Sequence, residues 1–274
     1  MSEDDDESEP VELLADDDRP GGWLLLIDRI RQSYVDLDDP TYLDFEYVQA
    51  FAEVVDALPE GPLAVTHVGG GACTLARYIA HTRPNSAQIV LEPDERVTDL
   101  VRTRLPFGRR VRIRIRPVDG RRGIADLKDA SADMLVLDAF AGGRVPGELT
   151  TAEFFAEVAR VLKPSGVLLV NAADGDTMRY TRRLVAAVRS ALPEVALRTD
   201  PAVLKARRFG NVVLAAARAD LPVAAIQRAA ASAMFPQRVL AADELNSFVA
   251  AAEPLTDAAP LRSPEPPDEL WRVS

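Results

Sequence analysis

The stretch that decides the fold is Thr66–Arg77, THVGGGACTLAR. An apolar run leads into three consecutive glycines, Gly69–Gly71, and a helix-like segment follows them. Glycines let a ligand approach the backbone closely, and a helix N-terminus offers free N–H groups. The spacing is G-x-G-x-x-T rather than the full dinucleotide fingerprint, so a tight turn between a strand and a helix is the alternative interpretation.

From this loop onward, short apolar runs alternate with helix-like segments. The runs that we interpret as strands are LAVTHV, Gln88–Glu92, Val111–Pro117, Asp133–Phe140 and Lys163–Asn171. Strands that alternate with helices of about 10–15 residues indicate a parallel, doubly wound α/β sheet. Val111–Pro117 alternates apolar residues with arginines, which predicts an edge strand with one solvated face. Two later runs, Glu194–Asp200 and Gly210–Ala217, are expected to form an antiparallel hairpin.

The chain of 274 residues divides into four parts by composition. Residues 1–18 hold ten acids and no base, against a net charge of -11 for the whole chain, and we expect residues 1–20 to be a disordered acidic tail. Residues 21–60 predict an N-terminal β-element and a helix. Residues 61–220 form the Rossmann-like nucleoside-binding domain, and residues 221–274 predict C-terminal helices and a loose Pro-rich tail.

The composition excludes several classes of function. One cysteine rules out an internal disulfide or a cysteine-based metal cluster, and two histidines make no zinc site, so we expect no metal. The acidic N-terminus lacks the features of a signal peptide, and no apolar run reaches the roughly 20 residues of a membrane span. The arginines of residues 102–122 alternate with apolar residues in an acidic protein, so no nucleic acid is expected. A cytoplasmic protein without membrane contact is the prediction.

Acids follow three consecutive predicted strands. Glu92 lies 21 residues after Gly71 at the end of the second strand, where an acid faces ribose hydroxyls. Asp119-Gly120 follows the third strand, where an acid accepts from an adenine amino group, and Asp138 ends the fourth. The carboxyl ends of parallel strands meet at one edge of a sheet, so these groups are expected to lie together. A solvated strand end and an Asp-Gly turn are the alternatives.

This order of glycine loop and acids is similar to the class I S-adenosylmethionine-dependent methyltransferases, and more narrowly to the spermidine synthase (aminopropyltransferase) family. The resemblance covers Trp23 to Ala217. It implies a Rossmann-like doubly wound methyltransferase sheet of seven strands, mostly parallel, with a C-terminal antiparallel hairpin and a short N-terminal β-element. It also implies S-adenosylmethionine or decarboxylated S-adenosylmethionine as the donor substrate, and an amine as the acceptor.

The resemblance assigns roles to individual residues. LLIDRIRQS places Gln32 on a ligand-binding glutamine, and FEYVQA places Tyr47 on the active-site tyrosine. Gly69–Gly71 and Gly120 fall in the donor-binding loops. Glu92 and Asp119 match the acids for ribose and adenine, and Asp138 matches the acid that orients and deprotonates the attacking amine. The implied reaction is an SN2 displacement at a sulfonium carbon, which requires an aligned and neutral amine.

Two departures from the family lie at the substrate end. Ala72 stands where the family has the Asp that binds the aminopropyl amine of the donor, and Ala141 stands where a second acid grips the diamine. Phe140 makes the expected pocket more apolar, which disfavours a dication. Two rival functions therefore stay open, a methyltransferase on the same scaffold and a non-catalytic nucleoside-binding protein.

The remaining candidates are single residues. Cys73 is interpreted as a packed thiol rather than a nucleophile, and His67 as a hydrogen-bonded core residue. Asn171 and Asp174 either border the pocket or cap the next helix. The partner predicted by the resemblance is a small-molecule amine or another acceptor, and family members are commonly dimers or tetramers, which implies a homodimer as one assembly.

Overall fold

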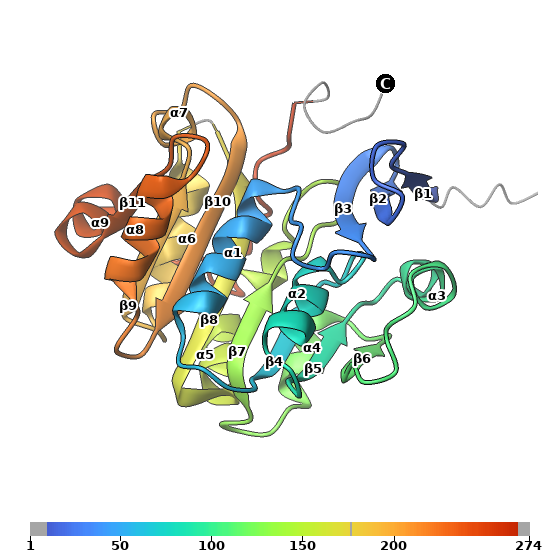
Figure 1. The fold of residues 1–274 in the computed structure, drawn as a ribbon. Coiled ribbons are helices and arrows are strands. Elements are labelled where there is room, and N and C mark those ends of the chain that lie inside the picture. Colours follow the sequence, from blue (N-terminus) through green and yellow to red (C-terminus); the bar gives the residue numbers. More distant parts are fainter. Residues whose placement is uncertain (1–9, 176, 268–274) are drawn as a thin grey trace, which may run out of the picture.

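A computed structural model describes residues 10–175 and 177–267. In it the chain builds a large sheet covered by helices on both faces, with a small antiparallel sheet beside it (Figure 1). The large sheet contains, in spatial order, β11 (Arg238–Ala241), β9 (Glu194–Thr199), β10 (Gly210–Ala217), β8 (Leu162–Asp174), β7 (Ala132–Leu137), β4 (Ala64–Val68), β5 (Ala87–Leu91) and β6 (Ile113–Arg116).

The strand order reverses beside β4. The chain runs from β4 to β5 and β6 on one side, then crosses to β7 and β8 on the other, and these five strands are parallel. β10 and β9 form the predicted antiparallel pair, and β6 is the predicted edge strand. Within the described residues the sheet has eight strands rather than the seven expected, because Arg238–Ala241 pairs with β9. Its four residues are too few to show a strand period in the sequence.

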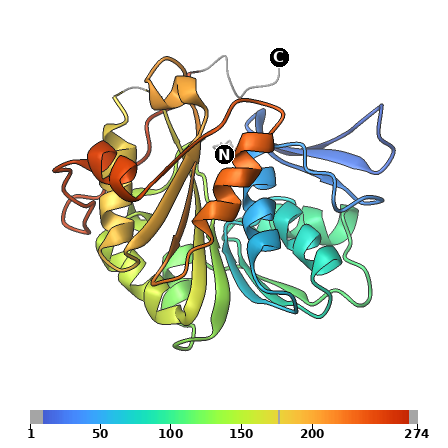
Figure 2. The same ribbon diagram turned by 60° about the vertical axis from the view of Figure 1, so that its left-hand side comes forward.

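Two helical layers enclose the sheet, as Figures 1 and 2 show from two sides. One layer contains α8 (Val223–Ser232), α1 (Glu46–Ala57), α2 (Thr74–Thr82) and α3 (Glu95–Arg104). The other contains α4 (Gly120–Ala125), α5 (Ala152–Val161), α6 (Arg179–Arg189) and α9 (Ala242–Val249). Two short helices, η1 (Gly147–Leu149) and α7 (Pro201–Leu204), complete the set. The central strands are buried on both faces, which explains their almost wholly apolar sequences.

The small sheet consists of β1 (Val11–Ala15), β2 (Gly22–Ile27) and β3 (Ile30–Asp36). The expectation of disorder throughout residues 1–20 is wrong for β1, because this segment pairs with β2, and Val11 and Leu13 pack against the apolar cluster that contains Leu25 and Val35. The short apolar alternation among the acids provides this face. Residues 1–9 of the predicted tail lie outside the described residues.

The C-terminal part forms the two predicted helices, α8 and α9, but its Pro-rich end is not loose as expected. Leu255 and Ser263 have no exposed surface, and the segment packs along the loop between β7 and α5. Residues 268–274 of this predicted tail lie outside the described residues. Across the described ranges, no helix combines the length and apolarity that a membrane crossing requires.

Candidate active site

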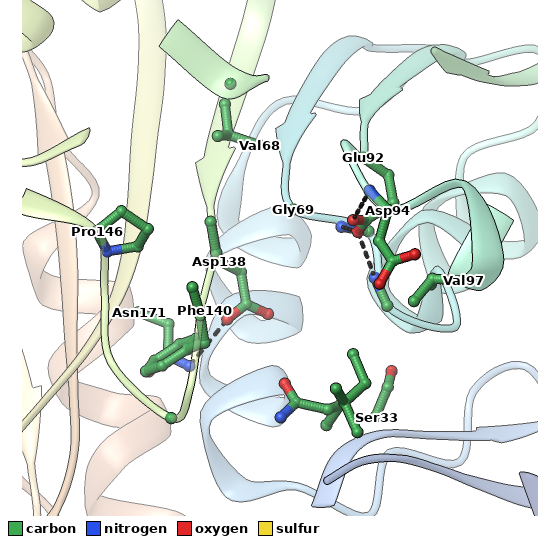
Figure 3. Close-up of a pocket in the computed structure, with 18 of the residues that line it drawn as sticks. Ser33, Val68, Gly69, Glu92, Asp94, Val97, Asp138, Phe140, Pro146 and Asn171 are labelled. Atoms are coloured by element: carbon green, nitrogen blue, oxygen red, sulfur yellow. Dashed lines mark hydrogen bonds between the residues drawn. The ribbon is translucent and has the colours of Figure 1, made fainter. Parts of the chain in front are cut away.

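A cavity of about 670 Å³ lies at the carboxyl ends of the parallel strands, where the strand order reverses (Figure 3). Its volume is in the range that holds a small organic ligand. Residues from β3, α1 and the loops after β4, β5, β6 and β7 line it. The lining includes every site residue predicted from the sequence: Gln32, Tyr47, Gly69, Gly70, Gly71, Glu92, Asp119, Gly120 and Asp138.

The glycine loop passes directly against the end of β7. Gly69 has φ +87°, and a Cβ on it would lie 2.1 Å from the carbonyl oxygen of Asp138. Only glycine meets both conditions. The N–H of Asp138 donates to the carbonyl of Val68 at 2.9 Å, and the N–H of Gly69 donates to that of Leu91 at 3.0 Å. The loop and Asp138 are thereby fixed relative to each other by backbone contacts.

Glu92 holds the glycine loop in place. One carboxylate oxygen accepts from the N–H of Gly70 at 2.9 Å and of Gly71 at 3.4 Å, and the other accepts from the N–H of Asp94 at 3.1 Å. Burial raises the pKa of Glu92, and these three N–H donors oppose that rise. The carboxylate has lone pairs beyond these bonds, which makes it an acceptor for hydroxyl groups in the cavity.

Asp119 has a structural contact as well as a place in the cavity wall. Its side chain caps α4 by accepting from the N–H of Arg122 at 3.1 Å. A Cβ on Gly120 would lie 2.4 Å from a methyl carbon of Val68, so glycine is required where α4 begins against β4. The Asp-Gly pair is therefore a helix start whose acid also faces the cavity.

Asp138 is the buried acid of the site. Desolvation raises its pKa to about 6, although hydrogen bonds from Asn171 and Tyr47 act in the opposite direction. The amide nitrogen of Asn171 donates to Oδ1 of Asp138 at 3.0 Å (Figure 3). The Tyr47 hydroxyl, carried by the first turn of α1, is the second partner, and burial with the neighbouring carboxylate raises its pKa well above 10. At neutral pH Asp138 is largely a carboxylate beside a protonated tyrosine.

Asn171 and Asp174 divide between the two roles that the sequence left open. Asn171 lines the cavity, and its Oδ1 is buried without a hydrogen-bond partner in the described structure. That oxygen is an acceptor available to a substrate N–H. Asp174 instead caps the helix that follows, accepting from the backbone and hydroxyl of Thr181 at 3.0 and 2.8 Å.

Several lining residues were not predicted. Phe45, Pro146 and Leu149 add apolar walls beside Phe140, which was expected in the pocket, Asp94 and Asn211 add polar groups, and Arg31 and Arg262 add positive charge. The position of Phe45 two residues before Tyr47 was a usable signal. Nothing in the sequence near Arg262 marks it, because its place depends on the packing of the C-terminal segment.

The three residues singled out near the loop are all structural. Ala72 has no exposed surface and packs in the cluster with Leu25 and Val35, so this position is filled rather than open to the cavity. Cys73 is buried in the same cluster, which agrees with the predicted packed thiol, and burial raises its pKa to about 12. Nε2 of His67 is hydrogen-bonded to Oε1 of Gln88 at 2.9 Å, and burial lowers the pKa of His67 to about 4.

Residues 10–175 and 177–267 contain no set of side chains arranged to bind a metal ion. Groups of three or more His, Cys, Asp or Glu side chains with metal-binding geometry do not occur there.

Comparisons with known proteins place this site in context. The chain is similar to a structure described as a probable spermidine synthase from Corynebacterium glutamicum, with 32% identity, a TM-score of 0.84, and coverage of 92% of this chain and 94% of the other. It is 29% identical to the polyamine aminopropyltransferase of Chromobacterium violaceum over 147 residues, which are 53% of this chain and 55% of the relative. The chain thus matches about half the length of that curated relative.

A third similarity concerns the fold alone. Human methyltransferase-like protein 13, solved in complex with SAH, aligns with a TM-score of 0.54 at 19% identity, over 68% of this chain and 92% of that one. No protein-family model matches the chain. The fold is the Rossmann-like methyltransferase fold, with a small N-terminal antiparallel sheet added. Because the identity of 32% extends across nearly all of both chains, this chain belongs to the spermidine synthase family.

Proposed function

We propose that the protein is a spermidine synthase-like transferase that binds S-adenosylmethionine or its decarboxylated form and transfers an aminopropyl group, which the decarboxylated form carries, to an amine. The single observation that supports this best is the buried pair of Asp138 and Tyr47 in a cavity that also contains the glycine loop. The curated relative named polyamine aminopropyltransferase supports the same class of reaction.

The nucleoside end of the donor has its partners in the loops after β4, β5 and β6. Glu92 accepts from the ribose hydroxyls while it holds the glycine loop. Asp119 faces the adenine amino group from the start of α4, and Gln32 contacts the donor from β3. The donor's sulfonium then lies toward Gly69 and Asp138, which are in backbone contact.

The chemical step needs a neutral nitrogen. Asp138 accepts a proton from the substrate ammonium, and the freed lone pair attacks the propyl carbon bonded to sulfur. The new N–C bond forms as the C–S bond breaks, and its electron pair stays on sulfur as methylthioadenosine leaves. A carboxyl group with a pKa of about 6 is ionised at pH 7 and serves as this base. Tyr47 donates to the carboxylate, and the Asn171 oxygen accepts from the amine.

Methyl transfer on the same scaffold is the second candidate. The observation that favours it is Ala72, which is packed in the apolar cluster and gives the cavity no acid for an aminopropyl ammonium. A non-catalytic nucleoside-binding protein is the remaining alternative.

The identity of the by-product tests the proposal. The purified protein is incubated with each donor and a panel of amines, and the nucleoside product is identified by mass spectrometry. We expect methylthioadenosine. S-adenosylhomocysteine would instead establish methyl transfer, and donor binding without either product would support the non-catalytic alternative. If neither donor raised the melting temperature, the site itself would be wrongly assigned.

A further inference from the structure

The C-terminal strap, residues 255–267, runs antiparallel along the outside of the loop that follows β7 (red in Figure 1). The N–H of Ala152 donates to the carbonyl of Leu255 at 2.8 Å at one end. Further along, the N–H of Val145 donates to the Ser263 hydroxyl at 2.9 Å, and the Arg144 guanidinium donates to the Ser263 carbonyl at 2.7 Å. The strap is therefore held in register with the cavity wall.

An ion pair anchors the start of the strap. Asp257 accepts two hydrogen bonds from the Arg121 guanidinium and one from the Thr151 hydroxyl at 2.6 Å. These bonds lower the pKa of Asp257. Its own N–H donates to Glu153 at 3.0 Å. Since Arg121 lies two residues after Asp119, the anchor connects the strap to the nucleoside side of the cavity.

Arg262 is fixed between these contacts and lines the cavity. Its neighbours Leu261 and Ser263 pack against Gly147 and Val145. Its side chain is exposed, and no described residue forms a hydrogen bond or an ion pair with its guanidinium. Arg31, the other arginine of the lining, is paired with Asp44 at 2.9 Å. Within residues 10–175 and 177–267, the charge of Arg262 is therefore uncompensated, whereas that of Arg31 is balanced by Asp44.

This free charge is unfavourable for a polyamine. The reaction end of the cavity offers one buried carboxylate, Asp138, and the rings of Phe45 and Phe140 line the same cavity. A diamine with two ammonium groups would find a single buried acid there and an arginine in the same cavity lining, and like charges repel in a partly desolvated site. A substrate that carries a carboxylate removes this conflict. The planar guanidinium fork matches a carboxylate with two parallel hydrogen bonds.

We infer that Arg262 is a specificity-determining residue that binds a carboxylate of the substrate, an inference that rests on the transferase function proposed above. The carboxylate belongs to the amino-acid end of S-adenosylmethionine or to the acceptor amine. Both sources present the same chemistry to the guanidinium, and matched ligand pairs separate them.

The experiment measures selectivity in the full chain and in Arg262→Ala. Calorimetry compares S-adenosylmethionine with decarboxylated S-adenosylmethionine, which differ only in the carboxylate. A second pair, 4-aminobutanoate and 1,4-diaminobutane, is compared in the presence of methylthioadenosine. We expect Arg262→Ala to lower the affinity for the carboxylate member of one pair by about tenfold and to leave its partner unchanged. A change in the first pair assigns the carboxylate to the donor, and a change in the second assigns it to the acceptor.

Controls keep the result specific. Arg110→Ala removes another exposed arginine, one that does not line the cavity, and is expected to change neither affinity ratio. Arg262→Lys, which keeps the charge without the fork, should give an intermediate ratio and reports on charge if the alanine variant is poorly folded. If Arg262→Ala leaves the affinity ratio within each ligand pair unchanged while the donors still bind, the inference is overturned and the proposed function stands. If neither donor binds the unmodified protein, both are overturned.

Discussion

The half of the cavity that we propose for the nucleoside holds its acid, Glu92, with backbone N–H groups, whereas the half that we propose for the reaction holds its acid, Asp138, with side chains. In the first half, Glu92 accepts from the amides of the glycine loop and of Asp94. In the second, Asp138 depends on Asn171 and Tyr47. Backbone donors are supplied by the fold and survive most substitutions, but side-chain donors do not. The reaction half is therefore the part in which substrate preference changes most readily within one fold.

The two acids also differ in how their charge is used. Burial raises the pKa of both, and three backbone N–H donors oppose that rise at Glu92. Asp138 has a pKa of about 6, close to neutral pH, which suits it to the proton exchange that we propose. The comparison predicts that a substitution of Glu92 affects donor binding, whereas a substitution of Asp138 affects the transfer step.

The largest effect is expected for Asp138→Asn. The amide cannot accept the amine proton, so the transfer rate should fall by roughly 10²–10⁴-fold. Donor affinity should change little, because the nucleoside half is intact. Single-turnover assays give the rate and calorimetry gives the affinity. A variant that lost donor affinity in proportion to rate would show that the two halves are not separable.

Glu92→Ala should produce the complementary result. It removes the ribose acceptor and leaves the glycine-loop amides without their partner, so we expect donor affinity to fall by about 100-fold. Calorimetry with either donor measures this, and Glu92→Gln, which keeps an acceptor oxygen, should lose less. Unchanged affinity in Glu92→Ala would disprove its ribose role.

The cost of keeping Asp138 charged predicts a stability effect. Its pKa is about 6 in the folded protein against 3.8 for a free side chain, so the folded state retains a proton that the unfolded state releases between about pH 4 and 6. Stability is accordingly lost as the pH rises through that window. Asp138→Asn avoids this loss and should be more stable by about 1–3 kcal/mol at pH 7. Urea unfolding of both proteins at pH 7 and at pH 4 tests this prediction. The difference in their free energies of unfolding should disappear near pH 4.

Ser263→Ala gives the smallest expected effect and tests how far the strap supports the reaction half. It leaves the buried N–H of Val145 without its acceptor, at a cost of about 1–2 kcal/mol. Hydrogen exchange should become faster in the loop after β7, and KM for the acceptor should rise more than KM for the donor. Equal exchange in both proteins would mean that the strap does not restrain the loop.

The sequence predicted which residues line the cavity better than it predicted the segments around them. Gly69, Glu92 and Asp138 were found because each follows an apolar strand, and parallel strands bring such ends to one edge. β11 and β1 were missed because short strands owe their existence to the edge that they pair with. Arg262 was missed for a related reason, since no local pattern records which distant segment packs against which loop.

The sequence by itself determined the parallel sheet, its edge strand β6 and the cavity at the strand ends, because hydrophobic period and glycine spacing are local properties of the chain. Tertiary structure alone decided which of Asn171 and Asp174 faces the cavity, how the pKa of Asp138 rises, and why Ala72 leaves no gap. It also decided that an arginine near the C-terminus lines the cavity. These properties depend on burial and on contacts between segments far apart in the chain, which periodicity does not encode.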